Sequence, residues 1–159
     1  LQFEHRSYKP QIRSELSIMA QIGLLEDNDR VAKLCATMLN FAGHQVTIYA
    51  HPKECLHALF STSMAHSDIP AAQESLHVSH LPVEVLILDL HLPDITGLEV
   101  LHHLQAHPDT RSLPLIFCTA ATDTEVAHAL RIAPRARLVS KPFKLQTLVS
   151  AIAKVLQTA

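Results

Sequence analysis

The chain has 159 residues, a length that suits one domain of ordinary size. Apolar residues make up 48% of it and charged residues only 18%, which excludes disorder as the main state, and no apolar run approaches the ~20 residues that a membrane helix needs. The formal net charge is −2, without the basic stripe and interleaved aromatic residues that would indicate direct binding of nucleic acid.

The first eighteen residues show no sustained hydrophobic period, and we expect residues 1–18 to be a tag or disordered leader and residues 19–159 to form the domain. The 12 histidines are scattered without the paired spacing of a zinc site, so we interpret them mainly as surface residues. The 3 cysteines fall within apolar patterns rather than in a cysteine-rich framework. A reducing, cytoplasmic location fits this usage best.

From Met19 the hydrophobic period alternates between that of strands and that of helices. The first half of the domain is predicted to contain a strand at Ile22–Leu25, an acidic loop, a helix around Val31–Leu39 ending at Gly43, a strand at Gln45–Ala50, and a helix that begins at Pro52. Residues 61–82 have no firm pattern and are interpreted as an inserted loop.

The second half continues the alternation. The predicted elements are a nearly continuous apolar strand at Val83–Leu90, a helix opened by Gly97, a strand at Leu113–Cys118, a helix with a capping box formed by Thr122 and Glu125, a strand near Arg137–Ser140 and a final helix from Leu145 to Leu156. Five strands alternating with five helices predict an α/β fold with a doubly wound parallel sheet, covered by helices on both faces.

In such folds the functional groups gather beyond the carboxyl ends of the strands. Five polar residues occupy these positions: Glu26, Asp27, Asp89, Thr119 and Lys141. Because converging carboxylates repel one another, a divalent cation is implied, and hard oxygen ligands suit Mg²⁺ or Mn²⁺. A hydroxyl and an ammonium group beside such an ion would bind a phosphoryl group, so the set favours phosphoryl transfer to a carboxylate, with Asp89 as acceptor.

Four short motifs carry a resemblance to a known family. They are Leu25-Glu26-Asp27, the run from Leu86 to Gly97 with its Asp89 and Pro-Asp-x-x-Gly turn, Thr119-Ala120, and Lys141-Pro142-Phe143. In this order and at strand ends they resemble the receiver domain of bacterial two-component response regulators, over about residues 20–157. The resemblance implies a flavodoxin-like sheet of strand order 2-1-3-4-5.

The resemblance also implies roles for individual residues. Asp89 would accept a phosphoryl group from a phosphohistidine of a sensor histidine kinase or a phosphotransfer protein. Asp27 would be the main metal ligand, with Glu26, Asp89 and the backbone carbonyl of His91 completing the protein's share. Thr119 would donate a hydrogen bond to the aspartyl phosphate, and Lys141 would form an ion pair with it. As in the family, the peptide bond between Lys141 and Pro142 would be cis.

This sequence departs from the family's pattern in four places. Leu138 stands where the family usually has an aromatic switch residue, so we expect a weakened switch, with Leu138 packed in both states. The position two after Thr119 is the small Ala121, which leaves the approach of a hydrolytic water unshielded on that side, and the position two after Asp89 is His91. The acidic pair is Glu-Asp, and the 61–82 insertion is longer than the family usually needs.

The expected partners are a sensor kinase or phosphotransfer protein and a downstream protein or output domain. The output would use the face of the fourth helix, fifth strand and fifth helix, around residues 124–133, Leu138 and 144–155, through which a homodimer could also form. We expect no enzymatic activity beyond self-catalysed phosphotransfer and autodephosphorylation. We also expect neither a nucleic acid nor a membrane as a direct partner. Two alternatives stay open: a receiver-like binding module that is not phosphorylated, and a haloacid dehalogenase-type phosphatase, which would want a carboxylate where His91 stands.

Overall fold

The computed structural model describes residues 19–64 and 81–158, without the side chains of residues 62–64. Strands and helices alternate along this part of the chain. The strands are β1 (Gln21–Leu25), β2 (Gln45–Tyr49), β3 (Val85–Leu88), β4 (Leu115–Thr119) and β5 (Arg137–Ser140). The helices are α1 (Asp29–Phe41), α2 (Pro52–Met64), α3 (Gly97–Ala106), α4 (Asp123–Ile132) and α5 (Leu145–Gln157). The leader expected at 1–18 lies outside the described residues.

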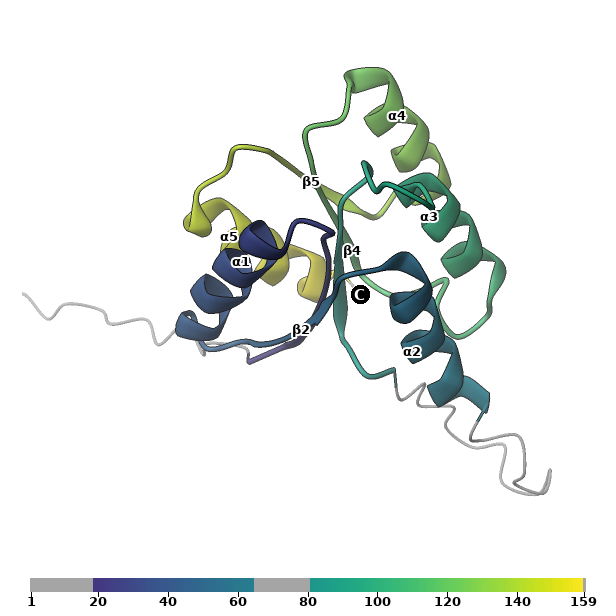
Figure 1. Cartoon of the computed structure of the whole chain (residues 1–159), viewed down its shortest axis with the longest axis horizontal. Helices are drawn as coiled ribbons and strands as arrows, with labels where there is room; N and C mark the ends of the chain where they lie inside the picture. The colour runs from purple at the N-terminus through teal and green to yellow at the C-terminus, as the bar shows by residue number, and fades with distance from the viewer. Residues whose placement is uncertain (1–18, 65–80, 159) are drawn as a thin grey trace, which may run out of the picture.

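The strands form one parallel sheet in the order β2-β1-β3-β4-β5, which confirms the predicted topology. Helices α1 and α5 cover one face of the sheet, and α2, α3 and α4 cover the other, as Figure 1 shows. Strand order reverses between β1 and β3, where the chain first returns across the sheet. Ligands of open α/β sheets bind beyond the carboxyl ends of the strands at such a point.

Strand β3 is buried along its whole length and divides the core into two clusters. Leu86 and Leu88 point to the α2/α3/α4 side, whereas Val85 and Ile87 point to the α1/α5 side. This alternation follows from the two-residue period of a strand, and burial on both faces explains why β3 reads as a continuous apolar run. The central strands are therefore fixed from both sides, and so are the residues that follow them.

Local capping signals explain where several helices begin and end. The Asn28 side chain accepts hydrogen bonds from the amides of Arg30 and Val31 at the start of α1, and Gly43, with φ of 95°, follows that helix in the left-handed conformation that glycine adopts most easily. Capping boxes begin α3, with Thr96, and α4, with Thr122. The box at Thr122 and Glu125 and the stop at Gly43 confirm predictions from the sequence.

Three predicted boundaries were wrong. Helix α2 continues to Met64, four residues into the segment expected to be a loop at 61–82, of which residues 65–80 lie outside the described part. Strand β3 is shorter than the predicted Val83–Leu90, and β4 is shifted from Leu113–Cys118 to Leu115–Thr119. Among the residues wrongly assigned to these two strands, Val83, Leu90 and Leu113 are buried outside the strands, because burial alone gives a residue an apolar identity without giving it a place in the ladder.

Candidate functional site at the carboxyl edge of the sheet

The parallel strands bring the predicted polar residues to one edge of the sheet. Glu26 directly follows β1, Asp89 follows β3, Thr119 ends β4 and Lys141 follows β5. Two backbone hydrogen bonds extend the ladder to this edge: the Asp89 amide donates to the Leu25 carbonyl at 3.2 Å, and the Lys141 amide donates to the Thr119 carbonyl at 2.9 Å. The backbone of the site is therefore continuous with the sheet.

Lys141 lies between two carboxylates. Its Nζ is 2.5 Å from Oε2 of Glu26 and 2.6 Å from Oδ2 of Asp89, and it donates a hydrogen bond to each. The three side chains are largely withdrawn from solvent, with exposed fractions of 21% for Lys141, 6% for Glu26 and 9% for Asp89. A single ammonium group thus compensates two buried negative charges. Without it, the burial of two unpaired carboxylates away from water would strongly destabilise the folded state.

The second oxygen of each carboxylate is also satisfied. Oε1 of Glu26 accepts the Asn28 amide at 3.1 Å, and Oδ1 of Asp89 accepts the His91 amide at 3.0 Å. Burial opposes the charged form of Lys141, but the hydrogen bonds from Lys141 to Asp89 and Glu26 outweigh it, and the pKa of the lysine is raised above its ordinary value. The ammonium form is therefore the stable partner of the two carboxylates.

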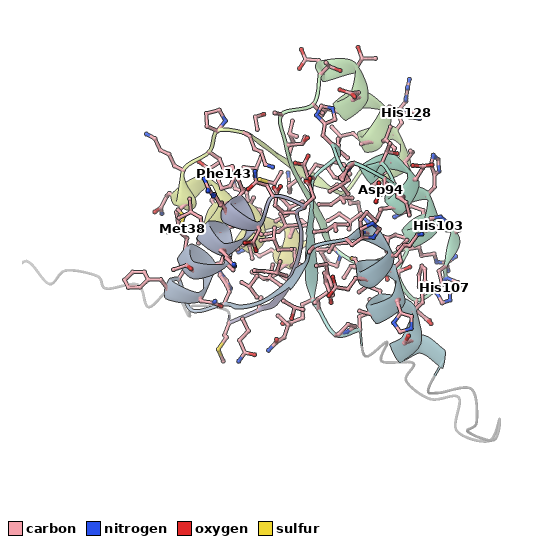
Figure 2. All side chains as sticks on the ribbon, viewed as in Figure 1. Met38, Asp94, His103, His107, His128 and Phe143 are labelled. Carbon is pink, nitrogen blue, oxygen red and sulfur yellow. The ribbon has the colours of Figure 1, made fainter. Side chains whose placement is uncertain are left out.

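Thr119 is almost fully buried beside this group, with 2% of its surface exposed. Its Oγ1 accepts the Ala121 amide at 3.1 Å, which leaves the hydroxyl hydrogen available for another acceptor. The Lys141–Pro142 peptide bond is cis, as the resemblance implied. Phe143, the third residue of that motif, lies on the α1/α5 side of the sheet (Figure 2) and packs against the core there.

Gly97 explains how tightly the Asp89 backbone is packed. A Cβ atom on Gly97 would lie 2.4 Å from the carbonyl oxygen of Asp89 and 2.5 Å from Cα of Leu90, both of them backbone atoms that cannot turn away. The Gly97 amide also donates to the Leu90 carbonyl at 3.1 Å. The start of α3 is therefore pressed against the segment that carries Asp89, and only glycine permits that approach.

Asp27 takes a different position from its neighbour Glu26. It is exposed, and with His91, Glu125, Thr96 and the apolar Leu90, Leu92, Pro93 and Leu98 it lines a groove beside the buried group. Within residues 19–64 and 81–158, no group of three or more His, Cys, Asp or Glu side chains is placed to hold a metal ion. The structure thus brings Glu26 and Asp89 together around Lys141, and it does not bring Asp27 into the same cluster.

The donor chemistry nevertheless fits a hard divalent cation. The carboxylates of Glu26, Asp27 and Asp89 and the backbone carbonyl of His91 are all oxygen donors, with no soft ligand among them. Lys141 is the cation that the buried pair holds in this structure. These oxygen donors therefore suit Mg²⁺ or Mn²⁺ by their chemistry. In this structure, however, Glu26 and Asp89 are arranged around the ammonium group of Lys141.

Sequence reasoning missed two side-chain contacts around the loop from β3 to α3. His51 Nε2 lies 2.9 Å from Oδ2 of Asp94, and His91 Nε2 lies 3.1 Å from Oε1 of Glu125. Their partners lie on other elements, so no local spacing signals them. His103 on α3, His107 just beyond it and His128 on α4 are labelled in Figure 2, and none of them belongs to a group of three metal ligands in the described ranges.

Comparison with known proteins decides the family. The family model for the response regulator receiver domain matches residues 22–153, which is most of the chain. The chain belongs to this family. Its resemblance to receiver domains, seen first in four short motifs, is thereby confirmed, and the receiver domain is a signalling module of two-component response regulators.

Curated relatives and solved structures agree with this assignment. The luminescence regulatory protein LuxO of Vibrio campbellii is 29% identical over 105 residues, which are 65% of this chain and 18% of LuxO. The regulatory protein LuxO of Vibrio vulnificus is 43% identical over 51 residues, 31% of this chain and 11% of that protein. The receiver domain thus matches less than a fifth of the length of these relatives.

Two solved structures show the same fold. The chemotaxis protein CheY4 of Vibrio cholerae is 21% identical with a TM-score of 0.67, and the alignment covers 87% of this chain and 99% of CheY4. The signal receiver domain of a LuxO repressor protein from Vibrio parahaemolyticus is 17% identical with a TM-score of 0.68, covering 89% of this chain and 92% of that chain. At these identities the likeness concerns the fold, which is the predicted flavodoxin-like one.

Proposed function

We propose that this receiver domain accepts a phosphoryl group on Asp89 from a phosphohistidine of a sensor histidine kinase or phosphotransfer protein. An Asp89 carboxylate oxygen would attack phosphorus as the P–N bond of the donor breaks, and the leaving imidazole would take up a proton. The domain would then act as a phosphorylation-dependent signalling module that catalyses its own phosphotransfer and dephosphorylation. It would work in the cytoplasm, where the free cysteines of its core remain reduced.

The observation that carries this proposal is the pairing of Asp89 with Lys141 at the carboxyl edge of the sheet. The Asp89 carboxylate follows the most buried strand and is held on both oxygens, by Nζ of Lys141 at 2.6 Å and by the His91 amide at 3.0 Å. These contacts orient the carboxylate before any donor arrives. The ammonium group would compensate the charge that phosphorylation adds, and the Thr119 hydroxyl hydrogen would be available to a phosphoryl oxygen.

We further propose that the site uses Mg²⁺ or Mn²⁺, held by Asp27, Asp89, the His91 carbonyl and, directly or through water, Glu26. When bound, such an ion would neutralise charge on the transferred phosphoryl group. The chain's own contribution is to pre-orient Asp89 and to keep bulk water from the buried carboxylates. Asp27, which is exposed in the groove, is the ligand that solvent and an incoming ion reach most easily.

The output surface proposed for this domain is the face formed by α4, β5 and α5. A groove on this face is lined by Leu130, Ala136, Arg137, Leu138, Val139, Gln146, Thr147, Ser150, Ala151 and Lys154. Leu138 is 41% exposed there, so the expectation that it stays packed was wrong for this state. Leu138 belongs to β5, which is an edge strand of the sheet. A downstream protein, an output domain or a second copy would contact this face.

The test is phosphorylation by a small donor. The protein is incubated with acetyl phosphate and Mg²⁺ and its intact mass is measured over time, alongside Asp89→Asn and the matched control Asp94→Asn. Asp94 lies on the same loop with 69% of its side chain exposed and makes no contact with Lys141. We expect one phosphoryl adduct in the parent and in Asp94→Asn, dependent on the metal ion, and none in Asp89→Asn.

Two outcomes would argue against the proposal. An adduct that persists in Asp89→Asn would move the acceptor elsewhere, with Glu26 the nearest buried carboxylate. The lack of any adduct in the parent, with acetyl phosphate or with a phosphorylated histidine phosphotransfer protein, would favour a receiver-like binding module that works without phosphate.

A further inference from the structure

The His91 side chain bridges the β3–α3 loop to helix α4. Its Nε2 lies 3.1 Å from Oε1 of Glu125, and both side chains are about half exposed, at 53% and 41%. Both line the groove that also contains Asp27. His91 lies two residues after Asp89 and its backbone amide donates to the Asp89 carboxylate, so the residue is held through its backbone by the proposed acceptor and through its imidazole by α4.

Glu125 is held so firmly that it can act as a fixed support for this ring. Its Oε2 accepts hydrogen bonds from the amide and the hydroxyl of Thr122, both at 2.8 Å, while Oε1 remains for His91. The pKa of Glu125 is lowered to about 2, chiefly by the backbone hydrogen bond from Thr122 and then by the side-chain bonds from Thr122 and His91. The carboxylate is therefore ionised and oriented by its own helix cap.

The domain contains a natural comparison for this arrangement. Helix α3 begins with the same capping box, in which Oε2 of Glu99 accepts from the amide of Thr96 at 2.7 Å and from its hydroxyl at 3.0 Å. Glu99 interacts electrostatically with His103 of its own helix, but no hydrogen bond joins it to a histidine among the described residues, and it does not line the groove. The two glutamates thus cap their helices in the same way, and of the two only Glu125 hydrogen-bonds a histidine beside the proposed phosphoryl site.

We infer that Glu125 is a positioning residue for the proposed phosphoryl site, which holds the His91 imidazole in the groove and so restricts the access of water to the aspartyl phosphate. The inference rests on the proposed phosphorylation of Asp89. It also modifies an expectation from the sequence. The sequence offered only the small Ala121 on the threonine side of the site, whereas Glu125, in the first turn of α4, makes the contact with His91.

Loss of the support should shorten the lifetime of the phosphate. Without Glu125 the imidazole can leave the groove, and the ring occupies its shielding position for less of the time. For a half-exposed, solvent-screened contact the change in population is small, so we expect hydrolysis to become about two- to fivefold faster in Glu125→Ala. His91→Ala should give a similar increase while retaining the backbone carbonyl and amide of residue 91.

The experiment measures hydrolysis of the aspartyl phosphate after the small phosphodonor is removed, in excess Mg²⁺. The variants are Glu125→Ala, His91→Ala, the double variant and the matched control Glu99→Ala, and Mg²⁺ affinity and melting temperature are recorded for each. We expect faster hydrolysis in the first three, with the double variant no faster than His91→Ala, because both single changes remove the same shield. Glu99→Ala should lose similar thermal stability to Glu125→Ala and keep the parent's hydrolysis rate.

The outcomes separate this inference from the proposed function. If a phosphoprotein forms and Glu125→Ala hydrolyses at the parent's rate, or if Glu99→Ala accelerates hydrolysis equally, the positioning role is refuted and phosphorylation stands. Additive effects in the double variant would show that Glu125 does not act through His91. Slower hydrolysis in His91→Ala would also refute the inference, because the ring would then assist water instead of excluding it. If no phosphoprotein forms in the parent, the proposed function and this inference fall together.

Discussion

The strongest prediction concerns the lysine that two buried carboxylates share. In Lys141→Met the carboxylates of Glu26 and Asp89 keep their burial and lose their common cation, while most of the apolar length of the side chain is retained. Removal of one partner from a buried ion pair destabilises a protein by about 3–5 kcal/mol. Because the Lys141 side chain is 21% exposed, water offsets part of this loss, and we expect a decrease of about 2–4 kcal/mol in the free energy of unfolding.

For a domain of this size, 1 kcal/mol corresponds to a shift of about 2–4 °C in melting temperature, so Lys141→Met should melt about 4–16 °C below the parent. The assay is thermal and urea unfolding at pH 7 without divalent ions. The control Lys33→Met removes the same kind of side chain from an exposed pair with Asp29, whose side chains are 70% and 73% exposed, and should leave the melting temperature unchanged. Mg²⁺ should stabilise Lys141→Met more than the parent, because the uncompensated carboxylates bind a cation more tightly.

The pH dependence has a definite sign. The pKa of Lys141 is raised in the folded state above its ordinary value of 10.5, so the lysine contributes its stabilisation fully below that pH and loses it as the pH rises through the folded pKa. The difference in stability between parent and Lys141→Met should therefore stay constant from pH 7 to about 10 and shrink above it. A melting temperature for Lys141→Met equal to that of the parent at pH 7 would refute the reasoning.

Three further predictions follow from the same structure. In an open helical site, Gly97→Ala would gain about 1 kcal/mol of helix propensity. Here the new Cβ would lie 2.4 Å from the Asp89 carbonyl oxygen, so we expect a lower melting temperature and slower phosphorylation. A higher melting temperature would contradict the close packing of α3 against the Asp89 backbone. Burial raises the pKa values of the thiols of Cys55 and Cys118 to about 12, so alkylation of the native protein by iodoacetamide at pH 8 should be slow and should accelerate on unfolding, whereas rapid native labelling of both would show that the core opens. On binding a beryllofluoride mimic, amide shifts should be large at Thr119 and modest around Leu138, which lacks an aromatic ring to exchange between buried and exposed positions; large shifts around Leu138 would show full coupling.

The sequence alone was enough to predict the fold and the edge that carries the site. The alternation of two-residue and 3.6-residue periods, the stop at Gly43 and the capping box at Thr122 are all local signals, and the structure confirms each of them. Parallel strands then place the residues that follow them at one edge without further information. For this reason Glu26, Asp89, Thr119 and Lys141 could be assigned to a common rim before any contact was known.

Only the tertiary structure decided how those side chains pair. Glu26 and Asp27 are adjacent and chemically alike, yet Glu26 is buried against Lys141 and Asp27 is exposed in the groove. The contact between Glu26 and Lys141 spans 115 positions of sequence, and the one between His91 and Glu125 spans 34. Such pairs depend on the register of strands and on the rotation of helices over the sheet, which the packing of the whole core sets. Periodicity specifies which face of an element is apolar, whereas the partner of a polar side chain is fixed only when that packing is complete.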